Sequence, residues 1–278
     1  LVNNAIINIT SGASVDCSGS NTISGSGAIN LNDGVLNVAN TTSIGGSQTL
    51  TTINAGVIEG NGTLEMGSGT TFNWTSGILR GLGTTRILAG AVLNINGGGN
   101  SSILQNNRII DNFGTINWST TGNIVYNLGS TNATINNSGN FNITASAGFS
   151  NQASGAQLTF NNNVGGTITK TNGNTTLDAN VNFVNSGTTN VNSGTLTLNN
   201  TSGSHAGAYN VANGATISGT HNINFTGSTF TNFGNVTNNA LSFSGTTATQ
   251  TLNGSGSISF LTINNTFGVD LGLSLIHI

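Results

Sequence analysis

A short motif returns at a nearly fixed interval along this chain, and that period restricts the possible folds more than any other feature. The segment GVIEG at 56–60 recurs as GILRG at 77–81, an offset of 77 − 56 = 21 residues. Two further segments, which begin at Gly62 and Gly69, recur at the same offset. Self-similarity at a fixed period of this size is typical of solenoids, in which each repeat is one unit of a continuous stack.

Later copies keep the motif while the interval varies between 20 and 27 residues. A constant motif at a variable spacing indicates that insertions lie in turns and that the strands stay in register. Solenoids tolerate such insertions because each coil contacts only its neighbours. The glycines that begin these copies are Gly90, Gly114, Gly139, Gly166, Gly187, Gly214, Gly234 and Gly256.

Each copy contains an apolar-polar-apolar triplet, for example Phe72-Asn73-Trp74 and Ile116-Asn117-Trp118. This alternation has the period of a β-strand with one buried face. The strands are bounded by Gly and Asn, which adopt the backbone conformations that corners require. An antiparallel sandwich or barrel would show similar alternation. The period favours instead an all-β fold, a single-stranded parallel β-helix (β-solenoid) of roughly 11–12 coils of about 20–27 residues.

Composition agrees with continuous ladders and excludes several classes of function. Only 4% of the 278 residues are charged, 35% are hydrophobic, and the chain has no proline, which would remove a ladder donor. With four Lys and Arg residues in total, the chain lacks the basic surface that nucleic acid requires. No apolar run approaches the roughly 20 residues of a membrane-spanning helix, so we expect no membrane insertion. Cys17 is the single cysteine, so a disulfide framework is excluded. We interpret Cys17 as a small apolar residue.

The 21-residue period makes a specific prediction about four charged residues. Glu59 and Glu65 precede Arg80 and Arg86 by one period each. Residues one period apart lie above one another in a solenoid, so we expect two ion pairs, Glu59–Arg80 and Glu65–Arg86, between neighbouring coils. A strip of paired charges that binds substrate is the alternative; cross-coil pairs that fix the register are favoured.

No catalytic, cofactor-binding or metal site is predicted, and the chain is expected not to be an enzyme. Glycosidase chemistry needs two carboxylates about 5–10 Å apart, and calcium β-rolls need repeated Asp residues after glycines. Arg108 beside Asp111 suggests a local turn pair, and Lys170 has only Asp178 as an acidic neighbour in sequence. His205 and His221 are expected to be exposed loop residues. The other carboxylates are widely separated along the chain: Asp16, Asp33 and Asp270.

Both ends suggest that the chain is a piece of a longer protein. Residue 1 is Leu, and no signal peptide is visible. Residues 273–278 (LSLIHI) resemble the translation of a transposase adapter used in sequencing libraries. We therefore expect residues 1–272 to be a β-solenoid repeat fragment, truncated at both ends, and 273–278 to be non-native.

Three segments carry a resemblance to a known group of proteins: GTLTLNN at 194–200, GAYNVANGATI at 207–217 and GSISFLTINN at 256–265. They resemble the β-helix repeats of bacterial surface adhesins, of the filamentous-haemagglutinin and autotransporter-passenger style. The resemblance covers roughly residues 21–272. It implies a secreted or cell-surface location, attached to the outer membrane through a part not present here, and a role in adhesion or as a stalk. The partners would be glycans or proteins of host or neighbouring cells, bound by a monomeric rod.

Two alternatives remain at this point. A polysaccharide-degrading β-helix enzyme needs acidic residues from different coils converging on one groove. An ice-binding solenoid needs rows of Thr-x-Thr on one flat face, and Thr195-Leu196-Thr197 is such a triplet. A non-enzymatic adhesin or structural stalk is favoured over both, because the carboxylates are scattered over many coils and the Thr-x-Thr triplet is not repeated coil after coil. Its flat faces are expected to be lined by Asn, Thr and Ser, which can hydrogen-bond glycans or a partner protein.

Overall fold

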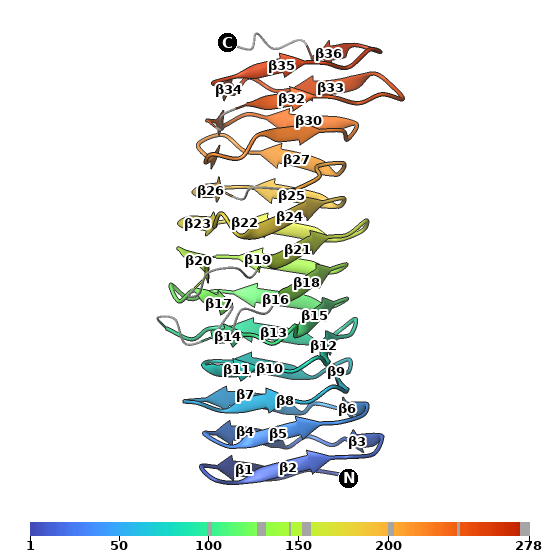
Figure 1. Cartoon of the computed structure of the whole chain (residues 1–278), viewed down its shortest axis with the longest axis vertical. Coiled ribbons are helices and arrows are strands. Elements are labelled where there is room, and N and C mark those ends of the chain that lie inside the picture. Colours follow the sequence, from blue (N-terminus) through green and yellow to red (C-terminus); the bar gives the residue numbers. More distant parts are fainter. Residues whose placement is uncertain are drawn as a thin grey trace.

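The computed structural model describes residues 1–98, 102–126, 132–144, 146–151, 157–199, 203–237 and 240–272. Within these ranges the secondary structure consists of strands, and no helix could cross a membrane. The strands stack into an elongated rod that rises from β1 at one end to β36 at the other (Figure 1). The residues of the expected adapter translation, 273–278, lie outside the described residues.

Most coils contribute one strand to each of three parallel sheets, here called sheets 1, 2 and 3. Sheet 1 has 13 strands: β1 (Ile6–Thr10), β4 (Ala28–Asn32), β7 (Thr49–Ile53), β10 (Thr71–Trp74), β13 (Val92–Ile95), β16 (Thr115–Trp118), β19 (Asn140–Ile143), β22 (Thr167–Lys170), β25 (Thr188–Val191), β27 (Ala208–Val211), β30 (Thr229–Asn232), β33 (Gln250–Asn253) and β36 (Val269–Leu271). Sheet 2 has 12: β2 (Ser14–Cys17), β5 (Val35–Val38), β8 (Val57–Glu59), β11 (Gly77–Leu79), β14 (Ser102–Leu104), β17 (Ile124–Tyr126), β20 (Ala147–Asn151), β23 (Asn174–Leu177), β26 (Thr195–Leu198), β28 (Thr216–Ser218), β31 (Asn235–Val236) and β34 (Ser257–Ile258).

Sheet 3 consists of an 8-stranded part and a 3-stranded part. The first part contains β3 (Asn21–Ile23), β6 (Thr42–Ile44), β9 (Thr63–Met66), β12 (Thr84–Ile87), β15 (Ile109–Asn112), β18 (Ala133–Asn137), β21 (Leu158–Asn162) and β24 (Val181–Asn185). The second contains β29 (Ile223–Phe225), β32 (Leu241–Phe243) and β35 (Leu261–Ile263). His205 joins the two parts, since it forms isolated parallel bridges with Asn185 on one side and Phe225 on the other.

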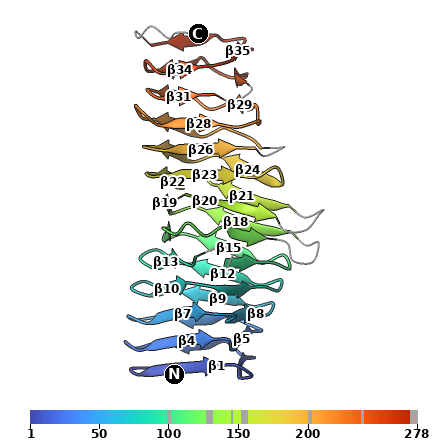
Figure 2. The ribbon, with the colours of Figure 1, turned by 90° about the vertical axis from the view of Figure 1, so that its left-hand side faces the viewer.

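The predicted all-β parallel solenoid is therefore confirmed. Its strands are short, and the chain turns between them as it passes from one sheet to the next (Figure 2).

The register of the stacked coils explains the repeated glycines. Gly77 has a φ of 94° and lies directly above Gly56, whose carbonyl oxygen occupies the space that a Cβ atom on Gly77 would need. Glycine is required there both for the backbone conformation and for the close stacking of coils.

The prediction was wrong about the register of the later copies. The copies from Gly90 to Gly187 lead into strands of sheet 1, but Gly214 leads into β28 of sheet 2. Gly207 continues the sheet 1 series, because β27 pairs with β25. The glycine-led motifs of sheets 1 and 2 are so similar that the sequence alone does not show to which sheet a copy belongs.

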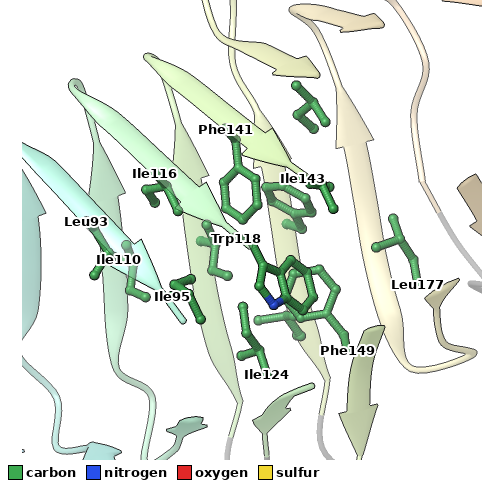
Figure 3. Packing of buried hydrophobic residues seen from close by; sticks show 14 of the residues in the cluster. Leu93, Ile95, Ile110, Ile116, Trp118, Ile124, Phe141, Ile143, Phe149 and Leu177 are labelled. Atoms are coloured by element: carbon green, nitrogen blue, oxygen red, sulfur yellow. The ribbon is translucent and has the colours of Figure 1, made fainter. Parts of the chain in front are cut away.

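Alternating burial along each strand produces one continuous apolar core. Trp118 is fully buried, and its ring centroid lies 5.1 Å from that of Phe149 and 6.4 Å from that of Phe141. Figure 3 shows these three side chains pointing into the interior from different strands, with Ile116, Ile124 and Ile143 around them. The aromatic stack continues along the axis through Phe160 and Phe183, whose ring centroids are 5.5 Å apart. Large rings compensate for the modest overall hydrophobic content because each one buries a large apolar area.

Candidate functional site

The outward face of sheet 1 carries one column of uncharged polar residues along nearly the whole rod. The central outward position of every strand from β1 to β33 is Asn or Thr. Strand pairing aligns these residues in register. The column is Asn8, Asn30, Thr51, Asn73, Asn94, Asn117, Asn142, Thr169, Asn190, Asn210, Thr231 and Asn253.

Neighbouring asparagines of this column, here called the outer ladder, are hydrogen-bonded to one another. The Asn94 Nδ2 donates to Asn73 Oδ1 at 3.0 Å, and the Asn117 Nδ2 donates to Asn94 Oδ1 at 3.1 Å. In the next coil, the Asn142 Nδ2 donates to Asn117 Oδ1 at 3.0 Å. A carboxamide has two N–H donors and two acceptor lone pairs. Each ladder residue therefore keeps hydrogen-bonding capacity for a ligand, repeated at the strand spacing of about 4.8 Å.

From β1 to β33 this face is also uncharged. In the described strands of sheet 1 the only charged side chains are Lys170, which points into the core, and Asp270 in the last strand. The exposed ion pairs lie instead on sheets 2 and 3. An uncharged surface gives no electrostatic attraction to ionic partners, so the chemistry of sheet 1 suits neutral, hydroxyl-rich or amide-bearing ligands.

The two predicted ion pairs are confirmed. The Arg80 Nε lies 2.7 Å from Glu59 Oε2, and the Arg86 Nη1 lies 3.0 Å from Glu65 Oε1. Arg86 also lies 3.7 Å from Asp111 and therefore bridges two neighbouring coils. These side chains are about a quarter to two-fifths exposed, so solvent weakens the attraction, which favours a role in register over a strong energetic one.

Arg108 was predicted wrongly. It forms no turn pair with Asp111; its side chain is completely buried at the corner between sheets 2 and 3. The guanidinium donates to Thr85 Oγ1 at 2.9 Å and to the carbonyl oxygens of Gly60 and Arg80 at 3.4 Å. Burial lowers the pKa of Arg108 to about 10, which still leaves it charged at neutral pH. Arg108 thus links three successive coils through neutral acceptors.

A second asparagine column is buried at the corner where sheet 3 ends, and we call it the inner ladder. Asn112, Asn137, Asn162 and Asn185 are all fully buried and stacked in register. The Nδ2 of each of the first three donates to the Oδ1 of the next at 2.7–2.8 Å. The remaining N–H groups donate to backbone carbonyls of sheet 1 strands, for example from Asn162 to Thr188 at 3.0 Å. Each of the four side-chain nitrogens thereby has a hydrogen-bond partner, as burial demands.

The histidines were also predicted wrongly, because both are buried rather than exposed. His205 follows Asn185 in the inner ladder column, and its Nε2 lies 2.9 Å from the Nε2 of His221. The Tyr209 hydroxyl lies 2.6 Å from Nδ1 of His205. Burial, and then repulsion by His221, lower the pKa of His205 to about 3. At neutral pH His205 is therefore uncharged and serves as the end of the inner ladder.

Lys170 occupies an inward position of sheet 1, between Ile143 and Val191 in the neighbouring coils. It is fully buried, and its Nζ has no hydrogen-bond partner among the described residues. Burial lowers the pKa of this amine. Lys170 does not pair with Asp178, its acidic neighbour in sequence, which instead accepts a hydrogen bond from the Tyr126 hydroxyl.

The carboxylates are placed on separate coils rather than in one groove. Asp16 lies in β2, Asp111 in β15 and Asp178 after β23, while Asp33 is in the turn after β4. Across the described ranges, no group of three or more His, Cys, Asp or Glu side chains comes together to hold a metal ion. Cys17 is buried, as expected of a small apolar residue.

Comparison of the chain with protein-family models, with curated proteins and with solved structures gives no match.

Proposed function

We propose that this chain is a non-enzymatic segment of a secreted or cell-surface bacterial protein, which acts as an adhesin, passenger or structural stalk. The outer ladder on sheet 1 is the observation that carries this proposal. It offers a long, flat and uncharged array of carboxamides and hydroxyls to a partner. Neutral glycans or surface proteins of another cell fit such a face, since both present hydroxyl or amide groups that exchange hydrogen bonds with Asn and Thr.

The stacked architecture also suits a stalk. About 12 coils at roughly 4.8 Å make a rod some 50–60 Å long. A low charge content reduces the influence of salt on such a surface.

Adhesion is favoured over ice binding by the order of residues on sheet 1. Within the described strands of sheet 1, outward Thr-x-Thr pairs occur at Thr49 and Thr51 in β7, and again only in β22 and β30. These strands are not neighbours in sheet 1. The triplet Thr195-Leu196-Thr197 lies in β26 of sheet 2. Asparagine holds most positions of the outer ladder, and its threonines, Thr51, Thr169 and Thr231, are separated from one another.

The test is a glycan-array screen together with a whole-cell adhesion assay on the purified chain. A matched pair of variants places one new charge on either sheet: Thr169→Lys on the outer ladder and Thr197→Lys on sheet 2. Both threonines point outward from the middle of a strand and are half-buried. We expect Thr169→Lys to lose glycan or cell binding and Thr197→Lys to retain it. Equal binding by the two variants would contradict a role for sheet 1, and no binding by the parent chain would contradict adhesion.

A further inference from the structure

Sheet 2 opens between β20 and β23, at about the middle of the rod. The five-residue strand β20 pairs with β17 through Phe149, Ser150 and Asn151. With β23 it pairs only through Ala147 and Gly148. The second half of β20 therefore separates from the coil above it, although both strands continue.

Side chains accept backbone hydrogen bonds at the opening and on either side of it. The Gly148 N–H donates to Asn123 Oδ1 at 2.8 Å, and the Asn174 N–H donates to Ser146 Oγ at 3.0 Å. The Asn151 N–H donates to Asp178 Oδ2 at 3.0 Å. Buried or half-buried backbone groups need such partners. The opening is thus held in shape by specific side chains in the free protein.

Asp178 is the centre of this arrangement. Its Oδ1 accepts hydrogen bonds from the Tyr126 hydroxyl, two coils away, and from the Asn180 N–H at 3.1 Å. Tyr126 is fully buried, and burial together with the Asp178 carboxylate raises its pKa, so the phenol remains a donor. A buried tyrosine on one coil thereby fixes the carboxylate on the edge of the opening.

The opening forms a groove of about 440 Å³. Its walls include Asp178, Asn174, Thr176 and Ser150. This volume lies within the range of about 300–1,000 Å³ that is usual for small-molecule sites. The oriented carboxylate can accept hydrogen bonds from hydroxyl groups of a sugar ring, and the surrounding amides and hydroxyls can donate to them.

We infer that the groove between β20 and β23 is a binding subsite for one neutral pyranose unit, with Asp178 as the acceptor for its hydroxyl groups. The ligand class follows from the proposed adhesive function, whereas the position follows from the groove alone. The subsite is distinct from the outer ladder, since it lies on sheet 2 and the ladder lies on sheet 1.

The test is saturation-transfer NMR and calorimetry of the full chain with methyl glycosides of glucose, galactose and mannose. Asp178→Asn removes the charge, and Asn174→Ala shortens an exposed side chain that makes no described side-chain hydrogen bond and should leave the fold intact. Asp33→Asn is the matched control, because Asp33 lies in an exposed turn with a φ of 61° that asparagine also adopts. Far-UV circular dichroism checks that each variant is folded.

We expect at least one glycoside to bind, and Asp178→Asn and Asn174→Ala each to weaken it roughly tenfold, as loss of a hydrogen bond to a charged or polar group predicts. Asp33→Asn should bind the glycoside as the parent does. Binding that Asn174→Ala and Asp178→Asn leave unchanged, or no binding of any glycoside, would overturn the subsite. Whole-cell adhesion that is lost in Thr169→Lys but kept in Asp178→Asn would contradict the subsite and still support the adhesive function.

Discussion

The two asparagine ladders use the same side chain and the same amide-to-amide hydrogen bond in opposite environments. The outer ladder lies on the exposed face of sheet 1, where Asn94 and Asn117 are half-exposed. The inner ladder lies at the corner that follows sheet 3, where Asn137 and Asn162 are fully buried. Water can replace a lost partner in the first ladder but not in the second.

This difference separates a surface role from a structural role. Buried polar groups that lose a partner retain the cost of desolvation, about 1–3 kcal/mol for each group. Exposed groups exchange partners with water at little cost, so evolution can vary an outer ladder for recognition without loss of the fold. The inner ladder instead fixes which coil lies above which, because a shift of one residue would leave its amides unpaired.

The largest effect is expected from Asn137→Leu in the inner ladder. Leucine is similar in size, but it leaves the donor of Asn112, the acceptor of Asn162 and the carbonyl of Thr167 without their partner. We expect the free energy of unfolding to fall by roughly 3 kcal/mol or more, measured by urea unfolding followed by circular dichroism. Asn117→Ala in the outer ladder is the control and should change it by about 0.5 kcal/mol or less. Equal losses would contradict the distinction between the ladders.

A smaller, pH-dependent effect is expected where the inner ladder ends at His205. Its pKa is lowered from 6.5 to about 3 in the folded chain, so the unfolded chain binds the proton first as the pH falls. Its contribution to stability is therefore complete above about pH 7 and is lost progressively between pH 6.5 and 3. From pH 7 to 5 we expect a loss of about 2 kcal/mol, at 1.36 kcal/mol for each unit.

His205→Asn sharpens this test, because it extends the inner ladder by one coil above Asn185. We expect this variant to keep its fold and to lose most of the pH dependence between pH 7 and 5. If the unfolding midpoint of the parent chain did not change over that interval, the assignment of His205 as a buried neutral base would be wrong.

The smallest effect is expected from the exposed ion pair on sheet 2. Glu59→Gln removes the charge opposite Arg80 but leaves both side chains about a third exposed. We expect the free energy of unfolding to change by about 0–1 kcal/mol and the difference to shrink in high salt. A loss comparable to that of Asn137→Leu would show that charge, rather than the inner ladder, fixes the register.

The sequence predicted the stack and the ion pairs because both depend only on the 21-residue period. Glu59 and Arg80 lie one period apart, so any parallel stack brings them together. The direction of side chains at corners could not be predicted in this way. Arg108 and His205 lie where a strand begins or is reduced to a single bridge, so the alternation of the flanking strands does not fix which way they face.

The candidate sites were predictable to different degrees. The outer ladder is visible in the sequence as the central Asn of successive triplets, such as Asn94 and Asn117. The groove at Asp178 was missed because its partner Tyr126 is 52 residues away, on a coil that is not adjacent. Only the three-dimensional stack shows that β20 leaves room for this contact.

The most direct test of the account is a distance measurement along the outer ladder. Spin labels on cysteines replacing Asn8 and Asn253, in a Cys17→Ser background, would be compared by pulsed electron paramagnetic resonance with labels replacing Asn8 and Asn117. Eleven coil steps predict about 53 Å for the first pair, and five steps predict about 24 Å for the second, at roughly 4.8 Å for each step. Distances that fail to grow in proportion to the number of coils would contradict the stacking from which both ladders and the proposed functions are inferred.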